Sequence, residues 1–353
     1  MAKTKAKNNG QYYNGEMVLE EAERINAGII MVTSNRSDGK TTWFLKEAKR
    51  RFKEYGHQLM LVYRYKYELS AAAEFFDGVQ QLDQDETEFT CKSFAQGMIY
   101  KIYYGDEPFG FAVALSNPDV IKKYSALFSK VEWMLMDEYQ SESGKYLPNE
   151  VEKLQSVYTS INRGGGYQSR DVKVILLGNM VSELNPYWIM FDITKRLRPD
   201  TKLLRSDGMI AEFHFNENAA NALKSNAFNR AMKDTAYAKY SQGEQWLINA
   251  NTFIEKGKGK SSYLATVVYE GHRYGVREYY EEGYILVSTK CDPNFKKVIS
   301  FKPADHNQNT MMLNHYSYLF ETLHTAFKQG YLRFDSMQSK NTMIDILGID
   351  LYK

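Results

Sequence analysis

Cysteine is almost absent from this sequence, and so are long apolar runs. Cys91 and Cys291 are the only two cysteines among 353 residues, and they are widely separated in the sequence. Two cysteines this far apart predict neither a set of structural disulfide bonds nor a cysteine-based metal-binding motif. The sequence is therefore typical of a protein from a reducing cytosol. No apolar run approaches the about 20 residues of a membrane-spanning helix, and we expect no membrane partner.

The sequence also lacks a net charge that would identify a partner. It carries 45 basic and 43 acidic residues, so nucleic-acid binding would have to depend on local patches. Residues 1–10 are basic but have no apolar segment behind them, so we expect no signal peptide and predict a flexible tail; an arm that touches nucleic acid or a capsid is the alternative. The 43% of apolar residues, with 27 Tyr and 19 Phe, suffices for a large core, and the length favours two domains.

A phosphate-binding loop is predicted between residues 28 and 56. The apolar run 28–32 leads into a polar loop that ends in Gly39, Lys40 and Thr41, and a helical pattern follows from Trp43 to Gly56. Strand, loop and helix in this order predict a P-loop, with Lys40 at the β- and γ-phosphates and Thr41 on Mg²⁺. Ser34 replaces the first glycine of the motif, and an ordinary Gly-Lys turn is the alternative interpretation.

A second motif lies at residues 131–138, where an apolar strand pattern ends in Asp137 and Glu138. This is the form of a Walker B strand, in which Asp137 would hold Mg²⁺ and Glu138 would polarise the attacking water. An acidic junction between a strand and a loop is the alternative. The position of the pair after a candidate P-loop, with strand and helix patterns between them, favours the Walker B interpretation.

Further strand patterns end in polar residues at 57–66 and 171–179. In a parallel sheet ligands bind at the carboxyl ends of strands, so we expect Arg64, Asp137, Asn179 and the P-loop to converge on one edge. The helix between the strands at 28–34 and 57–66 predicts that these two strands pair in parallel. Asn179 would sense the γ-phosphate or orient Glu138, or it would only form a turn.

The remaining patterns predict helices and two small β regions. We expect helices over 70–82, 118–130, 148–163 and 311–328, a β excursion over 89–116, a polar linker over 201–245 and an antiparallel meander over 263–288. The segment Lys256–Lys260 is either a solvated loop or a phosphate contact.

Four stretches, in this order and spacing, resemble the DNA-packaging ATPases of φ29-like tailed phages, which are terminase-type motors. They are residues 63–69, residues 137–138 with 146–151, residues 178–179 with 185–187, and residues 330–335. The resemblance implies an α/β fold in three parts: a RecA-like additional-strand P-loop ATPase domain at 1–205, a small linker domain at 206–248, and an RNase H-like α+β domain at 249–353.

The resemblance also implies the site residues. ATP would be bound by Lys66, Asn179 and the loop residues Ser34, Asn35, Arg36, Ser37, Asp38, Gly39, Lys40, Thr41 and Thr42. Mg²⁺ would be held by Thr41 and Asp137, Glu138 would be the catalytic glutamate, and Arg163 would be the arginine finger. Either Lys122 or Lys123 matches a further basic position of the family, and the sequence leaves that choice open.

The implied function is ATP-driven translocation of double-stranded DNA into a prohead through the portal protein, in the host bacterial cytoplasm at the portal vertex. The resemblance implies a homo-oligomeric ring of five and leaves open whether a structural RNA takes part. The C-terminal domain would bind nucleic acid without cutting it, because its first strand, 261–269, contains no Asp or Glu. The alternatives are another P-loop translocase or helicase, a nucleotide switch such as a GTPase, and a non-hydrolysing nucleic-acid or scaffold protein.

Overall fold

The computed structural model describes residues 12–83, 86–163, 168–197, 200–235, 238, 252–312 and 317–348. The predicted N-terminal tail and the three glycines after Arg163 lie outside this part of the chain. The chain forms two compact units, each assembled from separate segments. The first contains residues 1–140, 153–182 and 198–247, and the second contains residues 141–152, 183–197 and 248–353.

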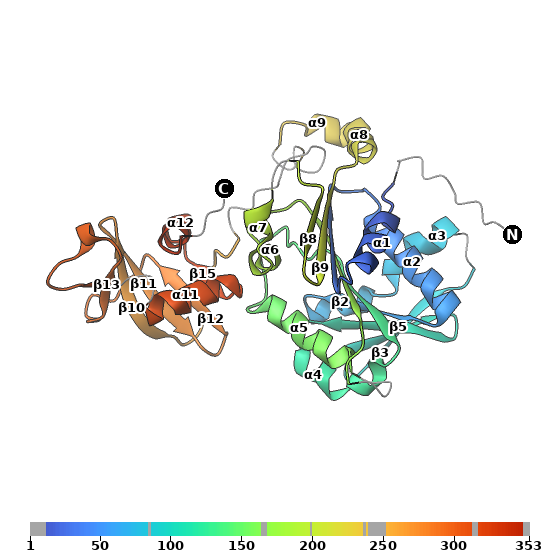
Figure 1. The fold of residues 1–353 in the computed structure, drawn as a ribbon, viewed down its shortest axis with the longest axis horizontal. Helices are drawn as coiled ribbons and strands as arrows, with labels where there is room; N and C mark the ends of the chain where they lie inside the picture. Colours follow the sequence, from blue (N-terminus) through green and yellow to red (C-terminus); the bar gives the residue numbers. More distant parts are fainter. Residues whose placement is uncertain are drawn as a thin grey trace. The chain divides into compact units, whose positions relative to one another are not determined.

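The first unit is built on one nine-stranded sheet in the order β3-β4-β5-β2-β6-β7-β1-β9-β8 (Figure 1). The strands from β5 to β9 in this order are parallel, and antiparallel hairpins close both edges. The bounds are β1 Ile29–Ser34, β2 Gln58–Tyr63, β3 Phe89–Phe94, β4 Ile99–Tyr104, β5 Glu107–Ala114, β6 Val131–Met136, β7 Lys173–Asn179, β8 Leu203–Ser206 and β9 Met209–His214.

The predicted P-loop strand, β1, does not pair with β2. Both run in the same direction in one sheet, but β6 and β7 lie between them, so the expected direct pairing was wrong. A crossover helix of 16 residues is long enough to pass over the intervening strands. The order therefore places the ends of β6 and β7 next to the end of β1, where the two predicted motifs can meet.

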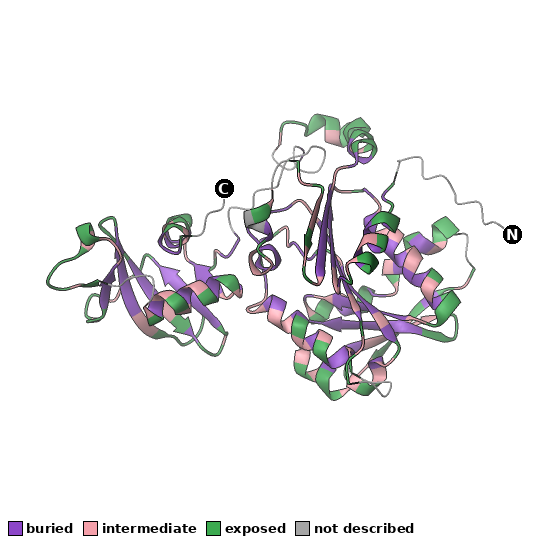
Figure 2. Cartoon of the chain, in the orientation of Figure 1, coloured by how far each residue is buried: buried purple, intermediate pink, exposed green. Residues whose placement is uncertain are grey.

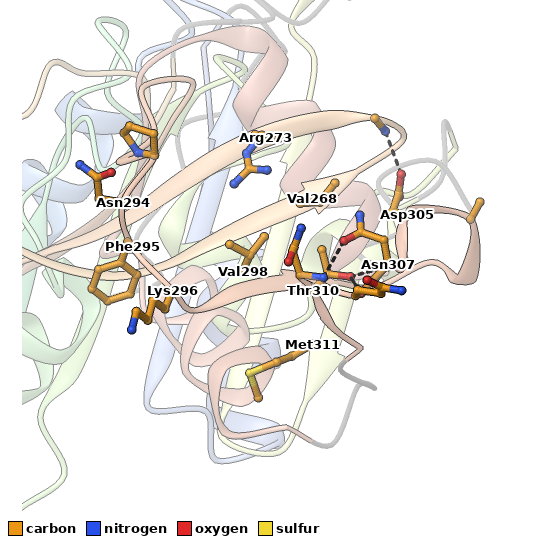
Figure 3. A pocket seen from close by; sticks show the side chains of 15 residues that line it. Val268, Arg273, Asn294, Phe295, Lys296, Val298, Asp305, Asn307, Thr310 and Met311 are labelled. Carbon is orange, nitrogen blue, oxygen red and sulfur yellow. Dashed lines mark hydrogen bonds between the residues drawn. The ribbon is translucent and has the colours of Figure 1, made fainter.

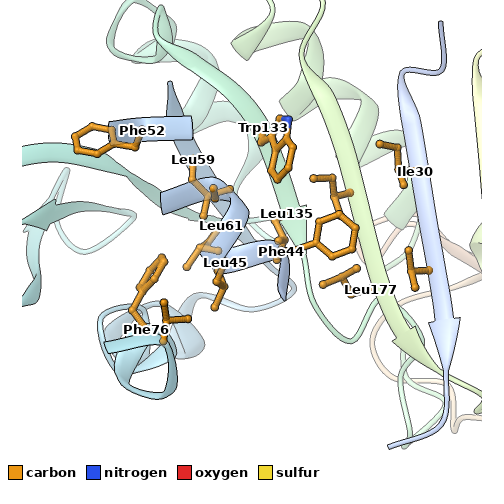
Figure 4. Packing of buried hydrophobic residues seen from close by; sticks show 14 of the residues in the cluster. Ile30, Phe44, Leu45, Phe52, Leu59, Leu61, Phe76, Trp133, Leu135 and Leu177 are labelled. Atoms are coloured by element: carbon orange, nitrogen blue, oxygen red, sulfur yellow. The ribbon is translucent and has the colours of Figure 1, made fainter. Parts of the chain in front are cut away.

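Helix α2 (Lys40–Tyr55) covers one face of this sheet. Phe44, Leu45 and Phe52 are buried against strand residues that include Leu61 and Trp133 (Figure 4). In Figure 2 the central strands β1, β2, β6 and β7 are almost wholly buried, whereas β3 and β8 at the edges and the outer helix faces are partly exposed. The other helices of the unit are α1 Glu16–Arg24, α3 Asp77–Asp83, α4 Pro118–Lys123, α8 Glu217–Ser225, α9 Ala227–Ala231 and most of α5 Glu150–Ile161, with short 3₁₀ helices at Lys66–Ala71, Glu74–Phe76 and Ser125–Phe128.

Three predicted segments of this unit differ from the structure. The helix expected over 70–82 is broken into 3₁₀ turns and the short α3, and the helix expected to reach residue 130 changes into a 3₁₀ helix after Lys123. The segment 201–214, expected to be part of a polar linker, forms the hairpin β8–β9, and β9 pairs in parallel with β1. The boundary drawn at residue 205 falls inside this hairpin, so any linker begins after His214.

The second unit contains a six-stranded sheet in the order β14-β13-β10-β11-β12-β15. The predicted antiparallel meander is confirmed as β10 (Ser262–Tyr269), β11 (His272–Tyr279) and β12 (Tyr284–Ser288). Strands β13 (Val298–Ser300), β14 (Met311–Met312) and β15 (Leu332–Phe334) pair in parallel with their neighbours. The helices are α6 Pro186–Met190, α7 Ile193–Arg196, α11 Tyr318–Lys328 and α12 Met337–Ile346, with a 3₁₀ helix at Pro303–Asp305, so the helix expected from residue 311 starts only at Tyr318.

Candidate nucleotide site

The predicted P-loop connects β1 to α2 at the carboxyl edge of the first unit's sheet. Gly39 caps α2 with φ 93°, a left-handed conformation that glycine adopts without a side-chain clash. Ser34 is the last residue of β1 and is fully buried, and it is not among the residues with positive φ. The backbone at Ser34 therefore does not require the glycine that the usual motif has at this position.

Two side chains of the loop are held by Asn216, which follows β9 and caps α8. Asn35 donates to the carbonyl of Asn216 (3.1 Å) and accepts from its N–H (2.8 Å). The Asn216 amide also donates to the buried carboxylate of Asp38 at 2.8 Å. Asn35 and Asp38 thus brace the loop through their side chains, and any contact they make with phosphate would come from their backbone N–H groups. Arg36 and Ser37 complete the loop, and Ser37 has φ 61°.

Lys40 and Asn179 meet at the ends of α2 and β7. The Lys40 ammonium is buried and donates a hydrogen bond of 2.8 Å to Oδ1 of Asn179. Burial lowers the pKa of Lys40, while the charges of Asp137 and Asp38 act to raise it. An ammonium held in a buried polar site at a helix N-terminus is suited to an anionic ligand, and a bound phosphate would supply the counter-charge it needs.

Thr41 and Asp137 form the second contact across the site. The Thr41 hydroxyl donates to Oδ2 of Asp137 at 2.8 Å, and the backbone N–H of Glu138 donates to Oδ1 at 2.9 Å. Burial raises the pKa of Asp137, opposed by the charge of Lys40 and by these hydrogen bonds. A hydroxyl and a carboxylate oxygen this close to each other form a donor set that fits Mg²⁺.

Glu138 is the exposed member of the acidic pair. It follows β6 with φ 54°, an uncommon conformation for a residue with a side chain, and it lies at the same carboxyl edge as Lys40 and Thr41. Strained backbone of this kind is concentrated at functional sites. Thr42, in the first turn of α2, is partly buried.

Tyr139 was not predicted, although it directly follows the acidic pair. Its hydroxyl hydrogen-bonds with that of Thr33 on β1 (2.7 Å), and its N–H donates to the carbonyl of Leu177 on β7 (3.1 Å). Its carbonyl accepts a bond of 2.9 Å from the buried guanidinium of Arg64. A Cβ atom at Gly178 would lie 2.7 Å from the Tyr139 ring, so only glycine fits there. Tyr139 therefore locks together the strands that carry the site.

Gln140 is a second residue that the sequence did not reveal. Its side-chain oxygen accepts hydrogen bonds from the N–H groups of Val181 (3.2 Å) and Ser182 (3.1 Å). Its amide donates to the hydroxyl of Tyr139 at 3.2 Å. The loop after Asp137 and Glu138 is thereby joined to the loop after Asn179. Adjacency to the acidic pair was the one sequence signal that could have pointed to both Tyr139 and Gln140.

The other predicted site residues are not part of this cluster. Arg163 follows α5 and is exposed, and it forms no hydrogen bond or ion pair with any residue of the described segments. Lys66 donates to the carbonyl of Gln96 at 3.3 Å. Lys122 is paired with Asp119 at 3.3 Å, and the Lys123 ammonium lies 6.0 Å from the centre of the Tyr124 ring. The structure therefore does not choose between the two lysines.

The second unit has an open hollow of its own, with a volume of about 890 Å³. Arg273 and Lys296 line it together with amide side chains such as those of Asn294 and Asn307 (Figure 3). It lies beside β10 and β13, and none of the predicted nucleotide-site residues lines it. In the described residues, no helix combines the length and apolar character needed to cross a membrane.

Comparison with known proteins gives a family match over nearly the whole chain. Residues 7–348 match the profile of the family described as podovirus DNA encapsidation protein (Gp16). The DNA packaging proteins of Bacillus phages PZA and phi29 are each 27% identical over 340 residues, which cover 95% of this chain and 96% of each relative.

Among solved structures, a chain of the Phi-28 gp11 DNA packaging motor is similar in fold, with a TM-score of 0.51 and 16% identity. The similarity covers 98% of this chain and 100% of that one. A chain of the bacteriophage Phi-29 viral genome packaging motor assembly matches with a TM-score of 0.49 and 25% identity, over 96% of this chain and 99% of that one.

Proposed function

The chain belongs to the family of podovirus DNA encapsidation proteins and is part of a viral genome-packaging motor, and from this premise we propose that it drives the motor by hydrolysing ATP. The energy of hydrolysis would move double-stranded DNA through the portal protein into a prohead. The protein acts in the infected host cell, and we place it at the portal vertex in the host cytoplasm.

One observation carries the enzymatic part of the proposal. Lys40 contacts Asn179, and Thr41 contacts Asp137, each at 2.8 Å, at the carboxyl edge of a parallel sheet. These residues come from three separate stretches of the sequence, and a chance Gly-Lys turn would not bring them together. The residue types match the three parts that ATP hydrolysis requires: a phosphate-binding cation, a metal-binding pair and a polar residue after the neighbouring strand.

Each residue has a role that follows from its position. Lys40 and the N–H groups at the start of α2 would bind the β- and γ-phosphates, with Asn179 as a further nucleotide contact. Lys66 lies outside this cluster and donates to the carbonyl of Gln96, so only the family resemblance supports it as a nucleotide contact. Thr41 and Asp137 would hold Mg²⁺, which neutralises charge on the phosphates when it is bound. Glu138 would accept a proton from the attacking water, and its exposed carboxylate leaves room for that water beside the nucleotide.

Arg163 would complete the site of a neighbouring subunit. Arg170, which lies between α5 and β7, donates to the carbonyls of Val131, the first residue of β6, and of Phe128, the last residue of the preceding 3₁₀ helix. The P-loop lies at the opposite end of the parallel strands, about 20 Å away along a strand of six residues. An exposed arginine at this edge is badly placed for its own P-loop, which supports action in trans within a homo-oligomeric ring, for which we propose five subunits.

We also propose a role for the second unit. Its strands β12-β11-β10 are antiparallel, and β13 and β14 extend the sheet in parallel with β10. This order supports an RNase H-like domain beginning near residue 249. Strand β10 contains no Asp or Glu, so the domain would bind nucleic acid or portal protein and would not cut DNA. A linker would occupy part of the chain between β9 and this domain, and a structural RNA is a further candidate partner.

The test is DNA-stimulated ATP hydrolysis by the full-length protein. The wild type should hydrolyse ATP faster when double-stranded DNA is added, and Lys40→Ala should abolish hydrolysis because it removes the buried phosphate-binding cation. Lys46→Ala, which removes a partly exposed lysine one to two turns further along α2, should retain activity. Equal activity of wild type and Lys40→Ala would show that the hydrolysis does not come from this site.

A further inference from the structure

The hairpin β3–β4 carries two lysines directly opposite each other. Lys92 on β3 pairs in register with Lys101 on β4. Side chains alternate along a strand, so Phe94, two residues from Lys92, and Tyr103, two residues from Lys101, lie on the same face as the lysines. The opposite face carries Phe89 and Ile102, which are buried in the core cluster beneath α2. The lysine face is therefore turned away from the core beneath α2; Lys92 is exposed on it and Lys101 half-buried, while Ile99 on the same face is buried.

Aromatic rings support the lysine side chains on this face. The Lys92 ammonium lies 4.8 Å from the centre of the Tyr103 ring, and the Lys101 ammonium lies 4.5 Å from that of Phe94. The Phe94 ring packs edge-on against the Tyr124 ring, with 5.1 Å between their centres. The Lys123 ammonium lies 6.0 Å from the centre of the same Tyr124 ring. We call this surface the β3–β4 basic face; it consists of Lys92, Phe94, Lys101, Tyr103, Lys123 and Tyr124.

The three lysines of the basic face are not neutralised within the described part of the chain. None of them forms an ion pair with a described carboxylate, whereas the neighbouring Lys122 is paired with Asp119. Like charges directly opposite each other destabilise an antiparallel pair. A lysine on an edge strand prevents the edges of two protein molecules from pairing, and this can explain the presence of Lys92 on the edge strand β3. It does not account for Lys101, because β4 is paired on both sides, with β3 and β5.

We propose that the β3–β4 basic face binds the phosphate backbone of double-stranded DNA. This rests on the proposed function, because DNA is the polyanion that a packaging motor must hold. Lysine ammonium groups bind phosphates as point charges, and base edges are read most specifically by side chains that form two parallel hydrogen bonds, such as those of Arg, Asn and Gln. None of the six residues of the face is Arg, Asn or Gln. Such a surface suits a motor that must move along DNA of any sequence.

The number of phosphates contacted can be measured from the salt dependence of binding. Each neutralised phosphate contributes about 0.9 to the slope of log affinity against log salt concentration for duplex DNA. The double variant Lys92→Gln, Lys101→Gln of the full-length protein should therefore lower this slope by about two. Its DNA-stimulated ATP hydrolysis should fall at physiological salt, and its hydrolysis without DNA should be unchanged, because neither lysine touches the nucleotide site.

Two control variants separate charge at this face from general effects. Lys92→Arg with Lys101→Arg keeps both charges and should keep the slope. Lys202→Gln with Lys224→Gln removes the same charge from exposed positions of the first unit, before β8 and in the last turn of α8, and should also keep it. Thermal unfolding of all variants should be similar to that of the wild type, because the Lys92 and Lys101 ammonium groups are held only by ring contacts.

The outcomes distinguish a DNA contact at the basic face, an RNA interface there, and failure of the proposed function itself. If the wild type binds duplex DNA and hydrolyses ATP but the Gln variant keeps the full slope, the basic face is not the DNA contact and the proposed function stands. If the Gln variant loses affinity for double-stranded RNA but not for DNA, the face is an RNA interface and our assignment is wrong. If the wild type neither binds DNA nor responds to it, the proposed function itself fails.

Discussion

The side-chain oxygen of Gln140 accepts a hydrogen bond of 3.2 Å from the backbone N–H of Val181, and a second of 3.1 Å from that of Ser182. One buried side chain thus joins the loop after β6 to the loop after β7. These loops follow the two strands that end in the acidic pair and in Asn179. We therefore expect a shift of one loop to move the other, which would make Gln140 a positioning residue for the nucleotide site.

We predict that Gln140→Ala lowers the free energy of unfolding by about 1–3 kcal/mol, because the buried N–H of Ser182 loses this hydrogen bond and that of Val181 keeps only its bond of 2.8 Å to the carbonyl of Asn179. It should also lower the rate of ATP hydrolysis more than it weakens ATP binding, since the residue orients the loops and does not face the ligand. Urea unfolding and steady-state kinetics measure the two effects. Gln155→Ala on the exposed face of α5 is the matched control and should change neither. An unaltered rate in Gln140→Ala would remove the coupling role.

Glu138 is predicted to be the catalytic base. Glu138→Gln keeps the shape of the side chain and leaves Thr41 and Asp137 in place, so ATP and Mg²⁺ should still bind. Hydrolysis should fall by about 10²–10⁴-fold, which is the usual contribution of a general base. Nucleotide binding and turnover should be measured in the same preparation, with Glu107→Gln at the exposed start of β5 as the control. Turnover like that of the wild type would exclude Glu138 from the mechanism.

The residues that the sequence predicted are those that neighbour one another along the chain. The P-loop from Ser34 to Thr42 and the pair Asp137–Glu138 are short local patterns, and the rule that parallel strands present their carboxyl ends at one edge was enough to place Asn179 beside Lys40. The apolar and alternating runs also predicted most strands correctly, because their period is a local property.

What the sequence did not reveal depends on contacts between distant residues. Tyr13 donates a hydrogen bond to Glu212, and Asn35 pairs with Asn216, across separations of 199 and 181 residues. No local pattern marks such partners. The position of β9 in the sheet was missed for the same reason. A six-residue strand in a polar region cannot be distinguished from a linker by its sequence, because only its pairing with β1 identifies it.

A prediction about pH concerns Lys340, which is buried in α12 of the second unit. Burial lowers its pKa to about 8. The unfolded chain then holds the proton more tightly than the folded one, so stability should rise as the pH increases through about 8 towards 10. At pH 7 the buried charge is a cost, and Lys340→Met should raise the free energy of unfolding by about 1–3 kcal/mol.

Urea unfolding at several pH values tests this. The gain in Lys340→Met over the wild type should shrink as the pH rises above 8, because the wild-type lysine becomes neutral. Lys328→Met, at the exposed end of α11, is the matched control and should show no such dependence. A constant difference between Lys340→Met and the wild type from pH 7 to pH 10 would mean that the charge of Lys340 is not the cause.

The last prediction is that Arg163 acts on the nucleotide of the neighbouring subunit. A guanidinium placed at the γ-phosphate in trans can accelerate hydrolysis by about 10³–10⁵-fold. Arg163→Ala should therefore bind ATP and hydrolyse almost none, and Lys40→Ala should be inactive because it lacks the phosphate-binding cation. Arg163→Lys keeps the positive charge but cannot form the bidentate hydrogen bonds of a guanidinium. It should therefore retain only part of the wild-type rate of hydrolysis.

Mixing the two inactive proteins distinguishes action in trans from action in cis. In a randomly mixed ring, about one interface in four pairs an intact P-loop from Arg163→Ala with an intact arginine from Lys40→Ala, since each component is present at one half. Mixed rings should thus regain up to about a quarter of wild-type hydrolysis if the interfaces act independently. Under action in cis no subunit carries both residues, and no mixture can recover activity. If cross-linking shows that mixed rings have formed and they remain as inactive as either parent, Arg163 does not act across the interface.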